Sequence, residues 1–251
     1  MPWRLVGRHL VFAGVWGALA LVVRLGGLQW LFAWPAASSL LLACAYAGRN
    51  PGLLGKRPDG TVALPARLLL LPHSLLRLAA IELRWRIALA PWHEVTPGLF
   101  LGGRTLEAPP GIETVVDLAA ELPESPRLRS ARRYLSCPVL DRWVPEPERF
   151  ENLLAEIERA RGPVYVHCGI GRGRSAMVAA GVLLSRGLAA DAADAERRLR
   201  EIRPGVRLHA EQRALLVSLE RGGGPPPRSR GSRAPGGDTR PRRRTPCSRG
   251  W

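Results

Sequence analysis

The sequence predicts an all-α N-terminal hairpin followed by an α/β domain whose central sheet is mostly parallel and flanked by helices. Two long apolar runs within residues 1–48 predict the hairpin. Between residues 92 and 220, short β-branched runs alternate with segments whose apolar residues recur at helical spacing, which is typical of an α/β domain. The net charge of the chain also changes near these boundaries.

The charge is concentrated at the two ends of the chain. The 251 residues carry a formal net charge of +16. Residues 1–91 and 221–251 each contribute +8, and residues 92–220 are neutral overall. We therefore divide the chain into a transmembrane hairpin (1–48), a connector with an amphipathic helix (49–91), a soluble α/β domain (92–220) and a tail rich in Arg, Pro and Gly (221–251). The tail has almost no apolar content and is expected to be disordered.

Composition also excludes some classes of protein. The basic segments lack interleaved aromatic residues, and no nucleic-acid-binding module is visible, so we expect no nucleic-acid partner. The cysteines show neither the spacing of metal ligands nor a disulfide framework; they are Cys44, Cys137, Cys168 and Cys247. We therefore expect no metal and no cofactor.

The apolar runs have lengths that suit a membrane. Residues 10–23 form an uncharged run of 14 residues, and residues 28–47 form one of 20, which as a helix matches the bilayer core. The first run is long enough only when counted from Leu5, with Arg8 at the interface. A cleaved signal peptide is the less favoured alternative, because a second run follows at once. Basic residues before and after the hairpin place both of its ends, and the domain that follows, on the cytoplasmic side.

The connector contains a second apolar segment. Residues 50–60 are rich in Pro and Gly and predict turns. Residues 62–90 are rich in leucine and carry arginines at positions 67, 77, 84 and 86. We expect a helix here, broken at Pro72, that either lies along the membrane surface or packs on the following domain.

The α/β domain should contain five strands and four helices. Strands are expected within 94–103 (two, joined by a turn), 112–118, 133–140 and 164–166, and helices over 147–161, 175–186, 191–203 and 209–220. Asp191 is the expected N-cap of the third helix. Asp117 and Cys137 lie inside strands, so a structural carboxylate and a core thiol are the favoured interpretations.

The stretch from Val164 to Ser175 combines a strand, a glycine-rich loop and a helix start. Glycines at 169, 171 and 173 allow a tight loop whose amides, with the helix dipole, attract an anion. A cysteine at the floor of such a loop should ionise readily, so Cys168 is expected to be a thiolate at neutral pH. Arg174 offers a planar fork to phosphate oxygens, and the Ser175 hydroxyl could donate to the sulfur.

The order His-Cys, five residues, Arg, Ser resembles the signature of cysteine-dependent phosphatases of the protein-tyrosine and dual-specificity type. The match covers His167, Cys168, Gly171, Arg174 and Ser175. The resemblance implies a dual-specificity-phosphatase-like catalytic domain over residues 92–220, in which Cys168 forms a phosphocysteine and His167 orients it. The expected phosphate-binding residues are Gly169, Ile170, Gly171, Arg172, Gly173 and Arg174.

The resemblance also implies an aspartate that protonates the leaving group. Asp141 is the candidate, because it ends a predicted strand 27 positions before the cysteine. An aspartate that only caps a loop is the alternative. Glu146 and Glu148 are better explained as acids in the first turn of the next helix.

The substrate is expected to be a phosphorylated protein, carrying phosphotyrosine, phosphoserine or phosphothreonine, at the membrane. The short domain without an obvious insertion favours a shallow cleft. A lipid phosphate is the alternative, because the hairpin would hold the site near headgroups and Arg172 adds a cation; the resemblance extends to the small mitochondrial phosphatidylglycerophosphate phosphatases. A non-catalytic phosphate-binding module is disfavoured by the presence of both Cys168 and Asp141, and a rhodanese-type sulfur-transfer protein by the spacing of Cys168 and Arg174.

Overall fold

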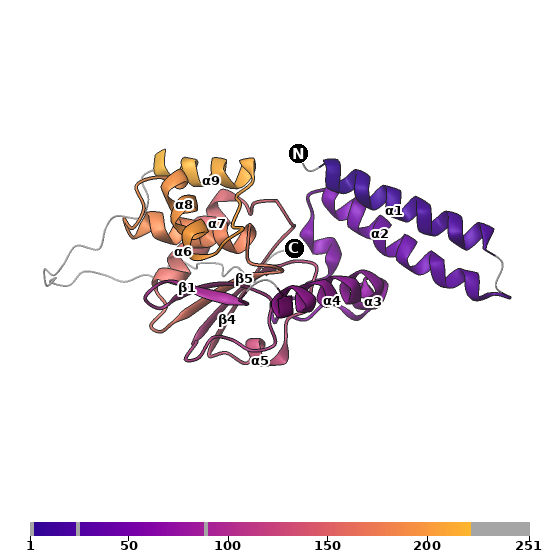
Figure 1. The fold of residues 1–251 in the computed structure, drawn as a ribbon, viewed down its shortest axis with the longest axis horizontal. Coiled ribbons are helices and arrows are strands. Elements are labelled where there is room, and N and C mark those ends of the chain that lie inside the picture. The colour runs from indigo at the N-terminus through magenta and orange to yellow at the C-terminus, as the bar shows by residue number, and fades with distance from the viewer. Residues whose placement is uncertain (1–2, 24–25, 88–89, 222–251) are drawn as a thin grey trace, which may run out of the picture.

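The computed structural model describes residues 3–23, 26–87 and 90–221 of the chain (Figure 1). Its N-terminal region contains α1 (Trp3–Val22), η1 (Leu28–Phe32), α2 (Ala33–Ala47), η2 (Pro51–Leu54), α3 (Leu64–Leu69) and α4 (Leu71–Ile87), where η marks a 3-10 helix. The predicted disordered tail lies outside the described residues from residue 222 onward.

The remaining elements form the predicted α/β domain. The strands are β1 (Trp92–Thr96), β2 (Leu99–Gly103), β3 (Thr114–Ala119), β4 (Arg133–Val139) and β5 (Val164–Cys168). The helices are α5 (Pro126–Arg129), α6 (Pro147–Glu158), α7 (Arg174–Ser185), α8 (Ala192–Ile202) and α9 (Ala210–Arg221). Asp191 caps α8 as predicted, because its side chain accepts a hydrogen bond from the Asp194 amide at 2.8 Å.

The five strands form one mixed sheet in the order β1-β2-β5-β3-β4. Only β1 runs antiparallel to its neighbour, and the pairs β2–β5, β5–β3 and β3–β4 are parallel. Helices α6 to α9 lie together on one side of the sheet (Figure 1). The predicted fold class, a mostly parallel sheet flanked by helices, is therefore confirmed.

The sheet topology explains how residues far apart in sequence meet. Parallel strands end at the same edge of a sheet, and ligands bind beyond that edge in such folds. The end of β5 is Cys168, and Gly103 at the end of β2 lies opposite it in the register. Glu121 and Asp141 each follow the end of a neighbouring strand, β3 or β4, by two residues. All four residues are thereby brought to one edge.

The two N-terminal apolar helices lie side by side as a hairpin (Figure 1). The segments Trp3–Val22 and Leu28–Ala47 are each 20 residues long and apolar enough to cross a membrane by length and composition. The first helix starts upstream of the apolar run, at Trp3, which supplies the extra turns that a span would need.

The connector helix breaks two residues before the predicted position. The break falls at Leu70, and Pro72 lies in the first turn of α4. This placement follows from the chemistry of proline, which has no amide hydrogen and is tolerated where a helix amide has no intrahelical partner. Pro72 therefore begins a helix here instead of interrupting one.

One face of α4 packs on the α/β domain. Ile81 is buried, and together with Trp85 it contacts a small cluster that includes Ala119, Leu122 and Ile170. On the opposite face, Leu75, Leu76 and Leu83 are exposed. The helix thus has one apolar side against the domain and a second apolar side facing away from it.

Buried contacts also join the hairpin and the connector to the domain. Leu5 of α1 and Tyr46 of α2 belong to the same core cluster as Cys168. The Lys56 ammonium is buried and lies 2.7 Å from the Asp117 carboxylate inside the sheet. Packing therefore continues across the boundary expected near residue 91.

Candidate active site

The loop between β5 and α7 turns its carbonyl groups away from its centre. Four consecutive carbonyls, those of residues 169–172, accept hydrogen bonds from outside the loop: from the Arg104 amide at 3.1 Å, the Arg203 guanidinium at 3.0 and 2.9 Å, and the Arg207 amide at 2.9 Å. Because the C=O and the following N–H of a peptide plane point in opposite directions, the amides of residues 170–173 face inward. The loop thus has the form of an anion-binding nest.

The backbone conformation of the loop requires a glycine at position 171. Its φ angle is +79°, a left-handed conformation that favours glycine. A Cβ atom at this position would lie 2.4 Å from the carbonyl carbon of Gly102, so no side chain fits without moving the adjoining strand.

The Cys168 sulfur lies at the floor of the loop. It accepts a hydrogen bond from the Gly171 amide at 3.3 Å, and the Ser175 hydroxyl lies 3.3 Å away. Burial by itself would raise the pKa of the Cys168 thiol, but the charge of Arg174 and these hydrogen-bond donors lower it below its ordinary value. Cys168 and Ser175 are therefore together, as predicted from their spacing.

Arg174 is buried and is held in place by a carboxylate that the sequence analysis did not identify. Its two terminal nitrogens donate to the two oxygens of Glu121 at 2.8 and 2.7 Å, and one of them also donates to the Val139 carbonyl at 2.7 Å. The Nε atom is buried and has no hydrogen-bond partner among the described residues. Arg174 thus keeps one donor available while Glu121 fixes the plane of its guanidinium.

Glu121 is strongly acidic in this environment. Burial by itself would raise the pKa of the Glu121 carboxyl, but Arg174 and Arg77 lower it far below its usual range. The signal that could have identified it is its position, three residues beyond the predicted strand 112–118.

Asp141 reaches the same site from the end of β4. Its Oδ1 lies 3.7 Å from Arg174 Nε, and its side chain is 37% exposed. The turn that carries it contains Arg142, which has a φ of +67°. The structure thus brings together the cysteine and the carboxylate that the sequence places 27 positions apart.

His167 points to a different group of residues. Its Nε2 lies 3.1 Å from the Glu124 carboxylate, and its ring stacks on Tyr165 at a centroid distance of 5.1 Å. Burial by itself would lower the pKa of His167, but Glu124 and Asp117 raise it above its ordinary value. The expected orienting effect of His167 on Cys168 stays a proposal, which would have to act through the strand that carries both residues.

Asp117, Glu124 and His167 form the one group of described side chains that could offer several ligand atoms to a metal ion. The Asp117 carboxylate already pairs with Lys56 at 2.7 Å and accepts a hydrogen bond from the Tyr134 hydroxyl at 2.6 Å. An ammonium group at this distance opposes a second cation. We interpret the group as a buried ion-pair network beneath the loop.

Arg203 holds the outer side of the loop by its hydrogen bonds to the loop carbonyls, and it was not identified from the sequence. It is fully buried, and besides the two loop carbonyls it binds the Ala90 carbonyl at 2.9 Å. Nothing in the local sequence distinguishes it from any arginine at the end of a helix. Its role depends on three segments that only the folded chain brings together.

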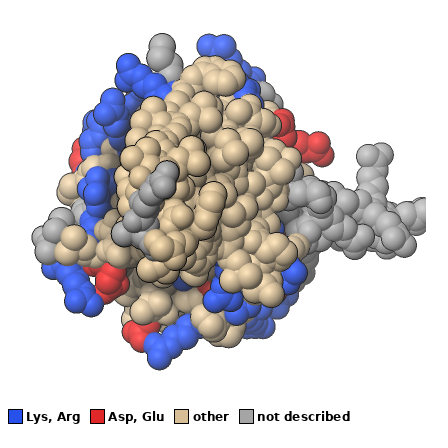
Figure 2. Space-filling view, turned by 90° about the vertical axis from the view of Figure 1, so that its right-hand side faces the viewer, with Lys and Arg blue, Asp and Glu red and all other residues tan. Residues whose placement is uncertain are grey.

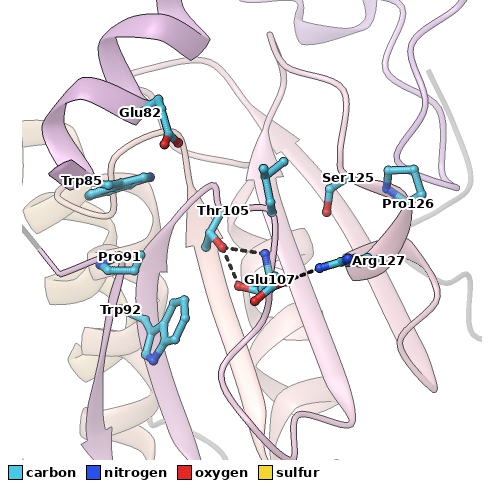
Figure 3. A pocket seen from close by; sticks show the side chains of 10 residues that line it. Glu82, Trp85, Pro91, Trp92, Thr105, Glu107, Ser125, Pro126 and Arg127 are labelled. Carbon is cyan, nitrogen blue, oxygen red and sulfur yellow. Dashed lines mark hydrogen bonds and ion pairs between the residues drawn. The ribbon is translucent and has the colours of Figure 1, made fainter.

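A cavity of about 620 Å³ lies near the site but is separate from it (Figure 3). Trp85 and Trp92 line one side, and Thr105, Glu107 and Arg127 lie opposite, linked by hydrogen bonds and an ion pair. No residue of the loop lines this cavity. The candidate active site is therefore the loop itself with Asp141, and not this cavity.

Comparison with known families agrees with this geometry. Residues 104–218 match the family model described as "Swiss Army Knife protein, DSP-PTPase phosphatase domain". This segment of the chain is therefore similar to phosphatase domains of the dual-specificity and protein-tyrosine type. A search of the curated proteins finds no match.

Several solved structures resemble the chain. The structure of PTPMT1 in complex with PI(5)P is 19% identical, with a TM-score of 0.47, and the match covers 53% of this chain and 96% of that one. Human DUSP28 is 28% identical, with a TM-score of 0.45, and the match covers 53% of this chain and 94% of that one. Tk-PTP in its active form is 28% identical, with a TM-score of 0.47 and coverages of 53% and 97%.

Proposed function

We propose that this protein is a membrane-tethered phosphatase that hydrolyses phosphomonoesters through a phosphocysteine intermediate. One observation supports this most strongly: the Cys168 sulfur, at the floor of the loop, accepts a hydrogen bond from the Gly171 amide, and the charge of Arg174, which has Asp141 3.7 Å away, lowers the pKa of its thiol. The two apolar helices support the membrane tether, with the catalytic domain on the cytoplasmic side.

Each residue has a definite role in the proposed reaction. The Cys168 thiolate attacks phosphorus, and the bond between phosphorus and the ester oxygen breaks. The amides of residues 170–173 and Arg174 Nε, which has no hydrogen-bond partner among the described residues, stabilise charge on the other phosphate oxygens. Asp141 donates its proton to the leaving oxygen.

The second half of the reaction regenerates the enzyme. Asp141, now a carboxylate, takes a proton from a water molecule that attacks the phosphocysteine. The sulfur leaves as a thiolate, and the Ser175 hydroxyl at 3.3 Å donates a hydrogen bond to it. Inorganic phosphate is released, and Cys168 is again ready to attack.

The direct test is phosphate release from an aryl phosphate by the full chain in detergent micelles. We expect turnover by the wild type and loss to background in Cys168→Ser. A phosphocysteine should be trapped by rapid acid quench and identified by mass spectrometry on the peptide containing residue 168. Turnover that survives the substitution would falsify the assignment of Cys168 as the nucleophile.

A further inference from the structure

The N-terminal region supplies a second guanidinium to the phosphate loop. Arg77 of α4 lies outside the segment that matches the phosphatase family. Its Nη2 is 3.0 Å from Glu121 Oε1, the same oxygen that accepts a hydrogen bond from Arg174 at 2.7 Å. A Cβ atom on Gly169 would lie 3.4 Å from Arg77 and 3.6 Å from Arg174. The two guanidinium groups therefore converge at the first residue of the loop.

Arg77 forms the outer member of this pair. Its side chain is 21% exposed, whereas that of Arg174 is 1% exposed. Glu121 balances only one of the two positive charges. A phosphate held by the loop amides and Arg174 would thus have Arg77 on the side that faces α4.

The base of the hairpin closes this side of the site. His9 of α1 stacks on Tyr46 of α2 at 5.6 Å and meets the edge of His73 of α4 at the same distance. His73 is one helical turn before Arg77. Burial and the charge of Arg77 lower the pKa of His73 to about 4, so it is neutral at physiological pH and does not repel the nearby guanidinium.

The hairpin also contacts the turn that carries the candidate acid. The Arg49 guanidinium, just after α2, lies 4.3 Å from the centre of the Trp143 ring. Trp143 is two residues beyond Asp141. The end of the hairpin and α4 therefore border the site on the sides of Asp141 and Arg77, respectively.

An uncharged surface extends from these elements. Figure 2 views the molecule from the hairpin side and shows a broad face whose described residues are uncharged, bordered mainly by Lys and Arg with a few Asp and Glu. The exposed apolar residues of α3, α4 and the hairpin include Leu64, Leu68, Leu75, Leu76, Leu83, Leu10, Val11, Phe12, Val15, Leu28, Trp30 and Leu31. An apolar area with a basic border matches a bilayer with anionic headgroups.

We propose that the phosphomonoester hydrolysed here belongs to a membrane lipid, and that Arg77 binds its headgroup beside Arg174. The proposal rests on the phosphatase function proposed above. A lipid phosphate approaches from the membrane surface, on the side where α4 and the base of the hairpin lie. The acyl chains stay in the bilayer that the uncharged face contacts, and the dianionic headgroup meets two arginines.

The test compares substrates on the full chain reconstituted in phosphatidylcholine vesicles. Phosphate release is measured from vesicles that contain phosphatidic acid or a phosphatidylinositol monophosphate, from glycerol 3-phosphate in solution, from phosphopeptides and from an aryl phosphate. We expect a higher kcat/KM for at least one of the lipids than for the peptides or glycerol 3-phosphate. A preference for the phosphopeptides, or for the soluble ester, would overturn the proposal.

Arg77→Gln should then lower lipid turnover about tenfold or more, as expected for the loss of one charge-assisted hydrogen bond, and aryl phosphate turnover much less. The matched control is Arg86→Gln, on the same helix, whose guanidinium is 73% exposed and pairs with Glu82. Equal losses on both substrates would show that Arg77 only supports Glu121, and would overturn its role in headgroup binding.

A second variant avoids the buried network. Leu76 of α4 is 70% exposed, so Leu76→Glu should fold and should reduce lipid turnover more than aryl phosphate turnover. Leu188→Glu, at a position 41% exposed between α7 and α8 and outside the hairpin and the connector, should reduce neither. An unchanged lipid rate in Leu76→Glu would contradict the proposed approach. If the wild type hydrolyses nothing, including the aryl phosphate, the phosphatase function itself is wrong.

Discussion

Cys168 is a buried thiol whose ionised form is stabilised by three named groups. Burial opposes ionisation, and the Arg174 charge, the Ser175 hydroxyl and the Gly171 amide favour it. One unit of pKa corresponds to about 1.4 kcal/mol, so each donor matters for the fraction of thiolate at neutral pH. Because the pKa is lowered, the thiolate persists below the pH at which an ordinary cysteine is protonated.

The pH dependence of alkylation should reveal this shift. The rate at which iodoacetamide modifies Cys168 should have its midpoint below the value of about 8.5 of a free cysteine. Ser175→Ala removes one donor to the sulfur and should raise that midpoint. Mass spectrometry of the peptide with residue 168 separates the signal from the other thiols, and Cys168→Ser gives the background. An unshifted midpoint in the wild type would contradict this account of the site.

Asp141 should matter in proportion to the basicity of the leaving group. Asp141→Asn keeps the shape of the side chain but cannot donate a proton to the ester oxygen. We expect a loss in kcat of about 10²–10⁴-fold for an alkyl phosphate, whose oxygen needs the proton, and a much smaller loss for an aryl phosphate with a good leaving group. Equal losses for both esters would mean that Asp141 only helps to hold Arg174, 3.7 Å away.

At the level of the elements, the phosphate loop is shaped by hydrogen bonds to its outer surface. Arg203 holds two successive carbonyls with one planar fork, and the Arg104 and Arg207 amides hold the carbonyls on either side. Each carbonyl that is held on the outer side of the loop directs the N–H of the following residue towards the centre of the loop. The strand, the loop and α8 therefore act as one unit, because the position of the loop amides depends on the position of Arg203.

Arg203→Lys should show that the planar shape of the guanidinium, and not only its charge, is needed to hold the loop. Lysine keeps the charge but cannot hold two carbonyls with a planar fork. We expect kcat/KM for an aryl phosphate to fall about tenfold or more, since at least one hydrogen bond to a charged donor is lost. Arg200→Lys, one turn earlier on α8 and paired with Glu196, is the matched control and should stay near the wild-type rate. Full activity in Arg203→Lys would exclude the proposed support.

For the molecule as a whole, the N-terminal region is an integral part of the packed structure. Lys56 neutralises a buried carboxylate of the sheet, Arg77 pairs with Glu121, and Leu5 and Tyr46 share a core cluster with Cys168. The carboxylates of Asp117 and Glu121 and the Lys56 ammonium are buried, where an unpaired charge is costly. The segments that precede the family match therefore affect both the stability and the chemistry of the site.

Removal of the Lys56 charge should destabilise the full chain. Lys56→Met leaves the Asp117 carboxylate buried without its cation, and the free energy of unfolding in detergent should fall by about 3–5 kcal/mol. The exposed neighbour Arg57 provides the control, and Arg57→Met should have little effect. Adding Asp117→Asn to Lys56→Met should restore part of the loss in a double-mutant cycle. Independent, additive effects would show that the two groups do not interact.

Much of the local structure could be predicted because it depends on residues close together in sequence. The β-branched run before Cys168, the glycines of the loop and the Asp191 cap each determine their own element. The break in the connector helix was placed two residues too late, since Pro72 can also occupy the first turn of a helix. Glu121, Arg203 and Arg77 were missed, because each reaches the loop from a segment at least 29 residues away.

By itself, the sequence determined the class of fold, the order of most elements and the candidate reactive centre around Cys168, since hydrophobic periodicity and a contiguous motif are local properties of the chain. Only the tertiary structure decided which charges surround that centre. Parallel strand order brought Glu121 and Asp141 to one edge, and packing of α4 placed Arg77 beside Arg174. A buried charge needs an opposite charge close to it in the folded protein, and the number of residues between two charged side chains does not predict how close they lie.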